Sequence, residues 1–167
     1  IPARNMVGKL NEGFIWAMTI IGYNRNFVPL ACLGAAKKSV EETIEYAKQR
    51  QVMGKAMSKW QAVATELATA ATKIEAARML CYKALWLKDQ GQRHDAESSM
   101  AKWWGVMVAN EVLYTCMRLH GHYGWAKDFP FEQRLRDCLG MESADGPREV
   151  HMGIIARDLL GKEHAPF

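Results

Sequence analysis

The residues best suited to chemistry lie in a polar segment near the end of the chain, at residues 143–149. Within it, Asp145 comes directly before the turn-forming pair Gly146-Pro147. A positioned carboxylate can act as a general base that removes a proton from a substrate. Asp is also one of the commonest residues at the start of a helix, and Pro is typical of a first helical turn. Position alone therefore favours a helix-start role for Asp145 over a catalytic one.

Two further groups of polar residues fall at expected loops. Arg50 and Gln61 lie on either side of Gly54, and a second group covers residues 118–124. Loops held by a rigid scaffold are where binding residues concentrate. Both groups remain as candidate functional residues at loop junctions.

The histidines do not form a recognisable metal site. His120 and His122 are close in sequence, but no carboxylate stands near them and no Glu-x-x-His pair occurs anywhere in the chain. Carboxylate-bridged metal sites in helical bundles need that pair on two helices, so no metal is predicted. The sequence also lacks a Gly-x-Ser-x-Gly nucleophile motif and a phosphate-binding loop. The other histidines, His94, His151 and His164, are predicted to lie at the surface or to cap helices.

The composition predicts one globular domain. The chain has 167 residues, of which 49% are hydrophobic and 24% charged, which is enough to bury a sizeable core. The formal net charge is +4, but the basic residues are scattered, so a nucleic-acid-binding surface is not predicted. No apolar run reaches the length of a membrane span. Because the first residue is Ile1, we expect the chain to be the interior of a longer one.

The cysteines indicate a reducing compartment. They stand far apart, without a Cys-x-x-Cys pair, and read as reduced core residues: Cys32, Cys81, Cys116 and Cys138. The expected location is the bacterial cytoplasm, or a mitochondrial or peroxisomal matrix, and not the exterior.

Helical periodicity dominates the chain. Apolar residues recur at steps of three, four or seven over residues 58–88, with Ser58 as the expected N-cap. The same rhythm predicts a second long helix over residues 95–119. A third is expected over residues 26–50, where Pro29 falls in the first turn and is tolerated.

Shorter helices complete the expected fold. One amphipathic helix is predicted over residues 12–23, and two more follow Pro130 and Pro147, whereas strand-like alternation is nearly absent. Long helices with short connections pack as antiparallel neighbours. The sequence therefore predicts an all-α fold, an up-and-down four-helix bundle with short appended helices.

Short motifs spread over the whole chain resemble, in the same order, those of the C-terminal helical domain of the acyl-CoA dehydrogenases, flavoenzymes that oxidise acyl-CoA thioesters. Each motif is weak alone, but their order identifies residues 1–167 as a member of that family, without its N-terminal helical and middle β-domains. The motifs are Ile1-Pro2-Ala3-Arg4-Asn5, Arg25, Leu33-Gly34-Ala35-Ala36, Tyr46-Ala47, Arg50, Gly54, Gln61, Glu75-Ala76-Ala77-Arg78, Ala101-Lys102, Ala109-Asn110-Glu111, Leu119-His120-Gly121, Arg136-Asp137 and Ile155-Ala156-Arg157.

The resemblance implies FAD as cofactor, bound between domains and across a subunit interface of a homodimer or homotetramer. It also implies an acyl-CoA substrate and a separate electron-transfer acceptor. Residues matching Arg50, Gln61, Arg118 and Gly121 reach the FAD of the neighbouring subunit in relatives. The full expected set of cofactor-binding residues is Arg50, Met53, Gln61, Arg118, Gly121, His122, Pro147 and Glu149.

The resemblance also implies the catalytic residue. Asp145-Gly146-Pro147 takes the place of the family's Glu-Gly-Thr, whose Glu removes the α-proton of the thioester while the flavin takes the β-hydride. Asp145 is then the base, because Asn24, at the second position used in some relatives, cannot serve. Arg25 and Gly146 are the expected substrate-binding residues, although a helix-terminal ion pair is an alternative role for Arg25.

Several positions depart from the family's pattern. Met53 replaces an aromatic residue, Arg118 a glutamine, His122 a glycine and Pro147 a hydroxyl residue. These changes leave two hypotheses: an FAD-dependent acyl-CoA dehydrogenase that is active only when intact, or a catalytically silent bundle that serves oligomer assembly or partner binding. The retained carboxylate favours the enzyme. Reduction of an enoyl-CoA is a related reaction that the departures leave open.

Overall fold

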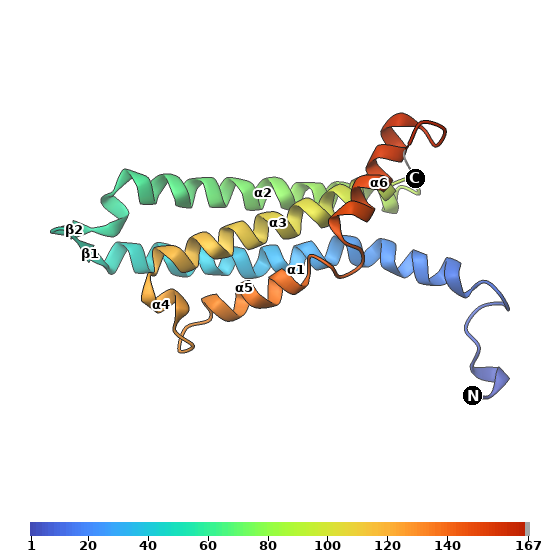
Figure 1. Ribbon diagram of the computed structural model, residues 1–167, viewed down its shortest axis with the longest axis horizontal. Helices are drawn as coiled ribbons and strands as arrows, with labels where there is room; N and C mark the ends of the chain where they lie inside the picture. The colour runs from blue at the N-terminus through green and yellow to red at the C-terminus, as the bar shows by residue number, and fades with distance from the viewer. Residues whose placement is uncertain (166–167) are drawn as a thin grey trace.

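The computed structural model describes residues 1–165, whose regular structure is almost entirely helical (Figure 1). Three long helices carry most of the chain: α1 (Gly13–Gln49), α2 (Gln61–Asp89) and α3 (Asp95–Leu119). Three shorter ones follow: α4 (His122–Trp125), α5 (Phe131–Gly140) and α6 (Arg148–Leu160). The other elements are the 3₁₀ turns η1 (Ala3–Asn5) and η2 (Met57–Lys59) and the strands β1 (Gln51–Val52) and β2 (Lys55–Ala56).

The long helices form an antiparallel bundle, and α5 packs against α1 and α3 as its fourth, shorter member (Figure 1). At the opposite end from the β-hairpin, α6 packs across the first turns of α3. The predicted all-α, up-and-down bundle with short appended helices is therefore confirmed. The helix predicted over residues 95–119 is α3 with the same bounds, and Pro130 and Pro147 are the N-cap residues of α5 and α6.

Small side chains let the helices approach closely. Ala36, Ala77 and Ala109 are fully buried, one on each long helix. A Cβ atom built on Gly105 of α3 would lie 2.8 Å from Cβ of Pro29, so these two helices are almost in backbone contact there. Burial of all four free cysteines in this core agrees with their predicted packing role.

The prediction of separate helices over residues 12–23 and 26–50 was wrong, because both belong to α1, with Pro29 in its interior. A proline inside a helix removes one hydrogen bond and needs room for its ring. The side-chain amide of Asn26 ties the segment together, donating to the Gly22 carbonyl at 3.2 Å and to Ser98 Oγ of α3 at 3.0 Å. Packing of Pro29 against Gly105 supplies the room, so tertiary contacts override the local break.

The start of α2 was also predicted wrongly, because Trp60, and not Ser58, is its N-cap. The preceding residues form a two-residue hairpin between β1 and β2, in which Met53 has φ 48° and Gly54 has φ 79°. Two consecutive positive φ angles are typical of the turn that joins tight hairpins. Trp60 Nε1 donates to the Val52 carbonyl at 3.3 Å, which fixes the hairpin against the helix start.

The end of α3 is anchored by His120. Its ring stacks on Tyr46 of α1 at 4.3 Å between centroids and lies 4.0 Å from Phe131 of α5. Its Nδ1 is 2.8 Å from the Cys116 carbonyl. This histidine therefore packs as a structural residue that joins three helices. Within residues 1–165, no helix has the length and apolarity that crossing a bilayer would need.

Candidate active site

The segment that carries Asp145 is a tight, irregular connection between α5 and α6. Asp145 has φ 54° and Gly146 has φ 112°, two consecutive residues in conformations that L side chains rarely adopt. A Cβ atom on Gly146 would also lie 3.4 Å from Nε2 of His151. Glycine adopts such a φ angle freely, so the strain of this turn lies at Asp145, which needs support from its surroundings.

Lys102 of α3 supplies one support. Its side chain is 1% exposed, and Nζ donates to two main-chain carbonyls of the turn, those of Glu142 and Gly146, at 2.7 Å each. Burial lowers the pKa of Lys102, while the charges of Asp145 and Glu142 oppose that shift. A lysine buried at this depth is normally paired, and here two carbonyls fill that role.

His151 of α6 supplies a second support. It is fully buried, and its Nε2 lies 3.1 Å from the Gly146 carbonyl. Burial, followed by the positive charges of Arg25 and Lys102, lowers the pKa of His151 to about 4, so the ring is neutral near pH 7. Because a carbonyl can only accept, the neutral ring donates from Nε2. The predicted surface or capping role of His151 was wrong: α6 turns this residue inward under the strained turn.

Arg25 approaches the same turn from α1. It is 8% exposed, and its Nε donates to the Asp145 carbonyl at 3.5 Å. The alternative of a helix-terminal ion pair is excluded, because α1 begins at Gly13 and Arg25 lies well inside it. The structure thus brings together Arg25, Asp145 and Gly146, the residues for which substrate chemistry was predicted.

The start of α6 completes this group. Pro147 is its N-cap and Glu149 lies in its first turn, and both are exposed. The helix has no side-chain N-cap hydrogen bond, so the helix-start role considered for Asp145 is not observed. Beside the turn lies an open cavity of about 380 Å³, lined by residues that include Lys102, Trp103, Met107, Glu142, Pro147 and Glu149.

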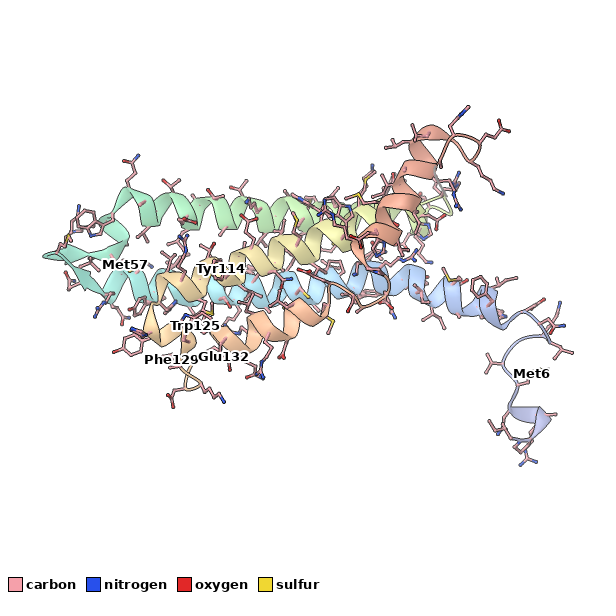
Figure 2. The ribbon with its side chains drawn as sticks, in the orientation of Figure 1. Met6, Met57, Tyr114, Trp125, Phe129 and Glu132 are labelled. Atoms are coloured by element: carbon pink, nitrogen blue, oxygen red, sulfur yellow. The ribbon has the colours of Figure 1, made fainter. Side chains whose placement is uncertain are left out.

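The other predicted cofactor residues gather at the hairpin end of the bundle. Met53, at the hairpin tip, is 87% exposed, and Arg50 and His122 are exposed as well. Gln61 lines a surface hollow on α2. A second hollow lies between α3 and α4, lined by Arg118, Gly121, His122 and their neighbours Tyr114 and Trp125, both labelled at this end in Figure 2.

Two details bear on cofactor binding at that end. Arg118 Nη2 donates to Glu66 Oε1 of α2 at 2.7 Å, so its guanidinium already has an anionic partner. Gly121 has φ 60°, whereas His122 is the first residue of α4 and has no positive φ. The backbone at His122 therefore accepts a side chain without strain.

The two groups of predicted residues are not brought together within one chain. Arg25 and Arg50 mark their positions on α1, and at 1.5 Å per residue about 37 Å of helix axis separates them. No single side chain spans such a distance. The two groups of predicted residues therefore lie at opposite ends of the same bundle.

Sequence reasoning missed Lys102, His151 and Glu66. Lys102 was noted only as part of a family motif, although it is the one charged residue within positions 100–109. A lone charge in an apolar helical stretch indicates a buried, partnered group. No comparable signal exists for Glu66, whose partner Arg118 is 52 residues away, or for His151, which meets a main-chain carbonyl that no side-chain pattern marks.

Comparison with known proteins agrees with this architecture. Residues 11–160 match the family model described as acyl-CoA dehydrogenase, C-terminal domain. Among curated proteins, the 3-(aryl)acrylate reductase of Clostridium sporogenes is 36% identical over 93% of this chain and 41% of its own length. The caffeyl-CoA reductase-Etf complex subunit CarC of Acetobacterium woodii is 35% identical over 97% and 43%.

A solved structure gives the same result. The butyryl-CoA dehydrogenase of Megasphaera elsdenii superimposes with a TM-score of 0.91 at 32% identity, over 96% of this chain and 42% of that one. The chain thus spans about two fifths of the length of the relatives it matches. By sequence and by fold, the chain belongs to the acyl-CoA dehydrogenase family and corresponds to its C-terminal helical domain.

Proposed function

We propose that this chain forms part of an FAD-dependent acyl-CoA dehydrogenase in which Asp145 removes the α-proton of the thioester. The observation that carries the proposal is the convergence of Arg25, Lys102 and His151 on the carbonyls of Asp145 and Gly146. Residues held in strained conformations by their surroundings cluster at active sites. Neighbours of Asp145 in this turn, Glu142 and Pro147, line the open cavity.

The proposed dehydrogenation needs only one base to account for the proton that leaves the substrate. Asp145 takes the proton of the α carbon, the β carbon loses a hydride, and a carbon–carbon double bond forms between them. FAD, when bound, supplies the two-electron acceptor for that hydride. None of the hydrogen bonds found within residues 1–165 uses the Asp145 carboxylate.

The residues at the hairpin end fit the phosphate-bearing part of FAD. Arg50 and Arg118 offer guanidinium donors that suit a pyrophosphate, and Gln61 adds an amide beside them. Because about 37 Å of helix axis separates Arg50 from Arg25, which contacts the Asp145 turn, the proposal places the two half-sites of one FAD on different subunits of a homodimer or homotetramer. Pro147 and Glu149, next to Asp145, are proposed to contact the flavin bound by their own chain.

We further propose that residues 1–167 are the C-terminal domain of a longer enzyme. The first turns of α1 extend beyond the bundle (Figure 1) and expose Phe14, Ile15, Trp16 and Ile20. Exposed apolar surface of this kind is typical of an interdomain contact.

Reduction of an enoyl-CoA is the second candidate, because two of the relatives described above carry reductase names. The same residues serve both directions, since the carboxylic acid of Asp145 would return its proton to the α carbon. The name of the second relative also supports an electron-transferring flavoprotein as electron partner.

The test is Asp145→Asn in the full-length, FAD-loaded protein. We expect loss of turnover in both directions with the flavin absorbance unchanged, because Asn cannot take a proton but fills the same space. Asp89→Asn, an exposed site at the end of α2, is the matched control and should keep wild-type turnover. Retained turnover in Asp145→Asn would overturn the assignment, and a colourless protein that cannot be reconstituted with FAD would indicate the silent bundle.

A further inference from the structure

Three side chains from three different helices donate to two consecutive carbonyls in the turn between α5 and α6. Lys102 and His151 both reach the Gly146 carbonyl, at 2.7 and 3.1 Å. Arg25 reaches the Asp145 carbonyl at 3.5 Å, the longest and weakest of the three contacts. The support of the turn thus rests mainly on Lys102 and His151.

Lys102 acts on the turn at two points. Its ammonium joins the carbonyls of Glu142 and Gly146, which enclose Asp145 in the sequence. Hydrogen bonds from an ionised donor are shorter and stronger than those between neutral groups. The buried ammonium of Lys102 therefore links the two ends of the turn and keeps residues 142–146 from relaxing to ordinary backbone angles.

The Asp145 carboxylate takes part in none of the hydrogen bonds found within residues 1–165, although its charge acts on the Lys102 ammonium. The position of its backbone therefore strongly limits where this side chain can lie. A backbone at φ 54° points Cβ differently from one in the α or β region. The contacts that fix the φ angle of Asp145 therefore also determine where its carboxylate can lie.

We propose that Lys102 and His151 are positioning residues that hold the turn in its strained form and thereby aim Asp145 at the substrate's α carbon. This inference rests on the proposed function, because it assumes that Asp145 is the base. Neither residue touches the reacting atoms. They act through the Gly146 carbonyl, and a displacement of the carboxylate by about 1 Å is enough to slow such a step by roughly 100-fold.

The experiment uses full-length, FAD-loaded protein and the variants Lys102→Met and His151→Phe, which keep size but lose the donor. His151→Gln, which retains an N–H donor, is the conservative rescue variant. The matched controls are Lys83→Met, which breaks an exposed ion pair to Glu97, and His94→Phe. Flavin bleaching is followed anaerobically with whichever of butyryl-CoA, cyclohexane-1-carbonyl-CoA and 3-phenylpropanoyl-CoA reduces the wild type fastest, with and without deuterium at the α carbon.

We expect Lys102→Met and His151→Phe to slow flavin bleaching by roughly 10- to 100-fold with little change in KM, and to raise the α-deuterium isotope effect. His151→Gln should stay within a few-fold of wild type. Amide hydrogen exchange, which needs no substrate, should become faster in residues 141–147 of the two donor-less variants only. A raised isotope effect together with faster exchange confined to residues 141–147 indicates a misplaced base. A general loss of structure would not confine the faster exchange to this segment.

The inference is overturned if the bleaching rates of both donor-less variants stay within twofold of wild type. It is equally overturned if bleaching slows without a rise in the α-deuterium effect, or if exchange in residues 141–147 does not change. Failure of the proposed function has a different signature, because Asp145→Asn would then retain turnover whatever the Lys102 and His151 variants do.

Discussion

Arg118 and Glu66 form an ion pair of 2.7 Å that joins the end of α3 to α2 beside the proposed phosphate site. The pair is about half exposed, so it contributes little to stability. If Arg118 binds a phosphate of the cofactor as proposed, it must share its donors between Glu66 and that phosphate. The ion pair therefore competes with the cofactor that Arg118 is proposed to hold.

Glu66→Gln should strengthen FAD binding. Removing the carboxylate leaves the Arg118 guanidinium free for a phosphate, and we expect the Kd for FAD to fall severalfold with little change in thermal stability. Titration of the apoprotein with FAD, followed by flavin fluorescence, measures this. Glu75→Gln, which breaks a surface ion pair to Arg78 elsewhere on α2, is the control. An unchanged or weaker affinity in Glu66→Gln would show that Arg118 does not meet the cofactor.

Gly146→Ala should impair both stability and turnover. Ala at φ 112° is strained, and its Cβ would lie 3.4 Å from His151, so we expect a loss of about 1–2 kcal/mol together with slower turnover. Gly140→Ala, in the last turn of α5 with no neighbour within 4 Å of the new Cβ, should change stability by less than about 1 kcal/mol. Thermal unfolding and steady-state turnover of the two variants test this, and equal effects would contradict the strained geometry.

Stability should fall at acid pH because of His151. The pKa of this group drops from 6.5 to about 4 on folding, through burial first and then through the charges of Arg25 and Lys102. Between those values the unfolded chain holds a proton that the folded chain lacks, so the free energy of unfolding decreases as the pH falls from 6.5 to 4. The total loss is about 3 kcal/mol.

The measurement compares thermal unfolding of the wild type with that of His151→Gln from pH 4 to pH 7. The variant lacks the titrating group, so the difference between the two proteins should shrink as the pH falls through this range. A stability difference between the two proteins that stays constant from pH 4 to pH 7 would show that His151 does not change its protonation on unfolding.

The bundle thiols should resist alkylation in the native state. Burial raises the pKa of Cys81 to about 12 and that of Cys116 to about 11, so neither forms much thiolate near neutral pH. Iodoacetamide treatment at pH 8, with peptide mapping by mass spectrometry, should label these positions only after denaturation. Rapid labelling of the native protein would contradict the packed core.

The fold was largely predictable because helical periodicity and family motifs are local signals. They gave α3 its bounds and located α5 and α6 after their prolines. The errors arose where distant contacts decide the local structure. Pro29 continues a helix because Gly105 of another helix makes room for it, and Ser58 loses its capping role to a hairpin held by Trp60.

The candidate site, too, was predictable only where local motifs mark its residues. Asp145, Arg25 and Gly146 were located by motif, and the structure brings them together. Lys102 and His151 act through main-chain carbonyls, which every residue has, so no side-chain pattern in the sequence indicates their partner. Residues that support a site through the backbone become visible only in three dimensions.

Mixed subunits provide a test of the two half-sites. Asp145 and Arg50 lie near opposite ends of one bundle, so the proposed site of a homodimer would take the first from one chain and the second from its partner. Asp145→Asn and Arg50→Glu should each abolish turnover as homodimers, the first by removing the base and the second by repelling the pyrophosphate. Co-expression with two different affinity tags allows the mixed dimer to be purified.

In that mixed dimer one of the two sites combines an intact Asp145 with an intact Arg50, because each chain carries only one of the two changes. We expect turnover per dimer to recover to about half of the wild-type value, as a symmetric two-site assembly requires. Pairing Asp145→Asn with Lys102→Met is the control, since both changes affect the same half-site and should give no such recovery beyond the residual activity of Lys102→Met. A mixed dimer of Asp145→Asn and Arg50→Glu that stays inactive would mean that both half-sites of one FAD lie on the same chain, which about 37 Å of helix makes physically unfavourable.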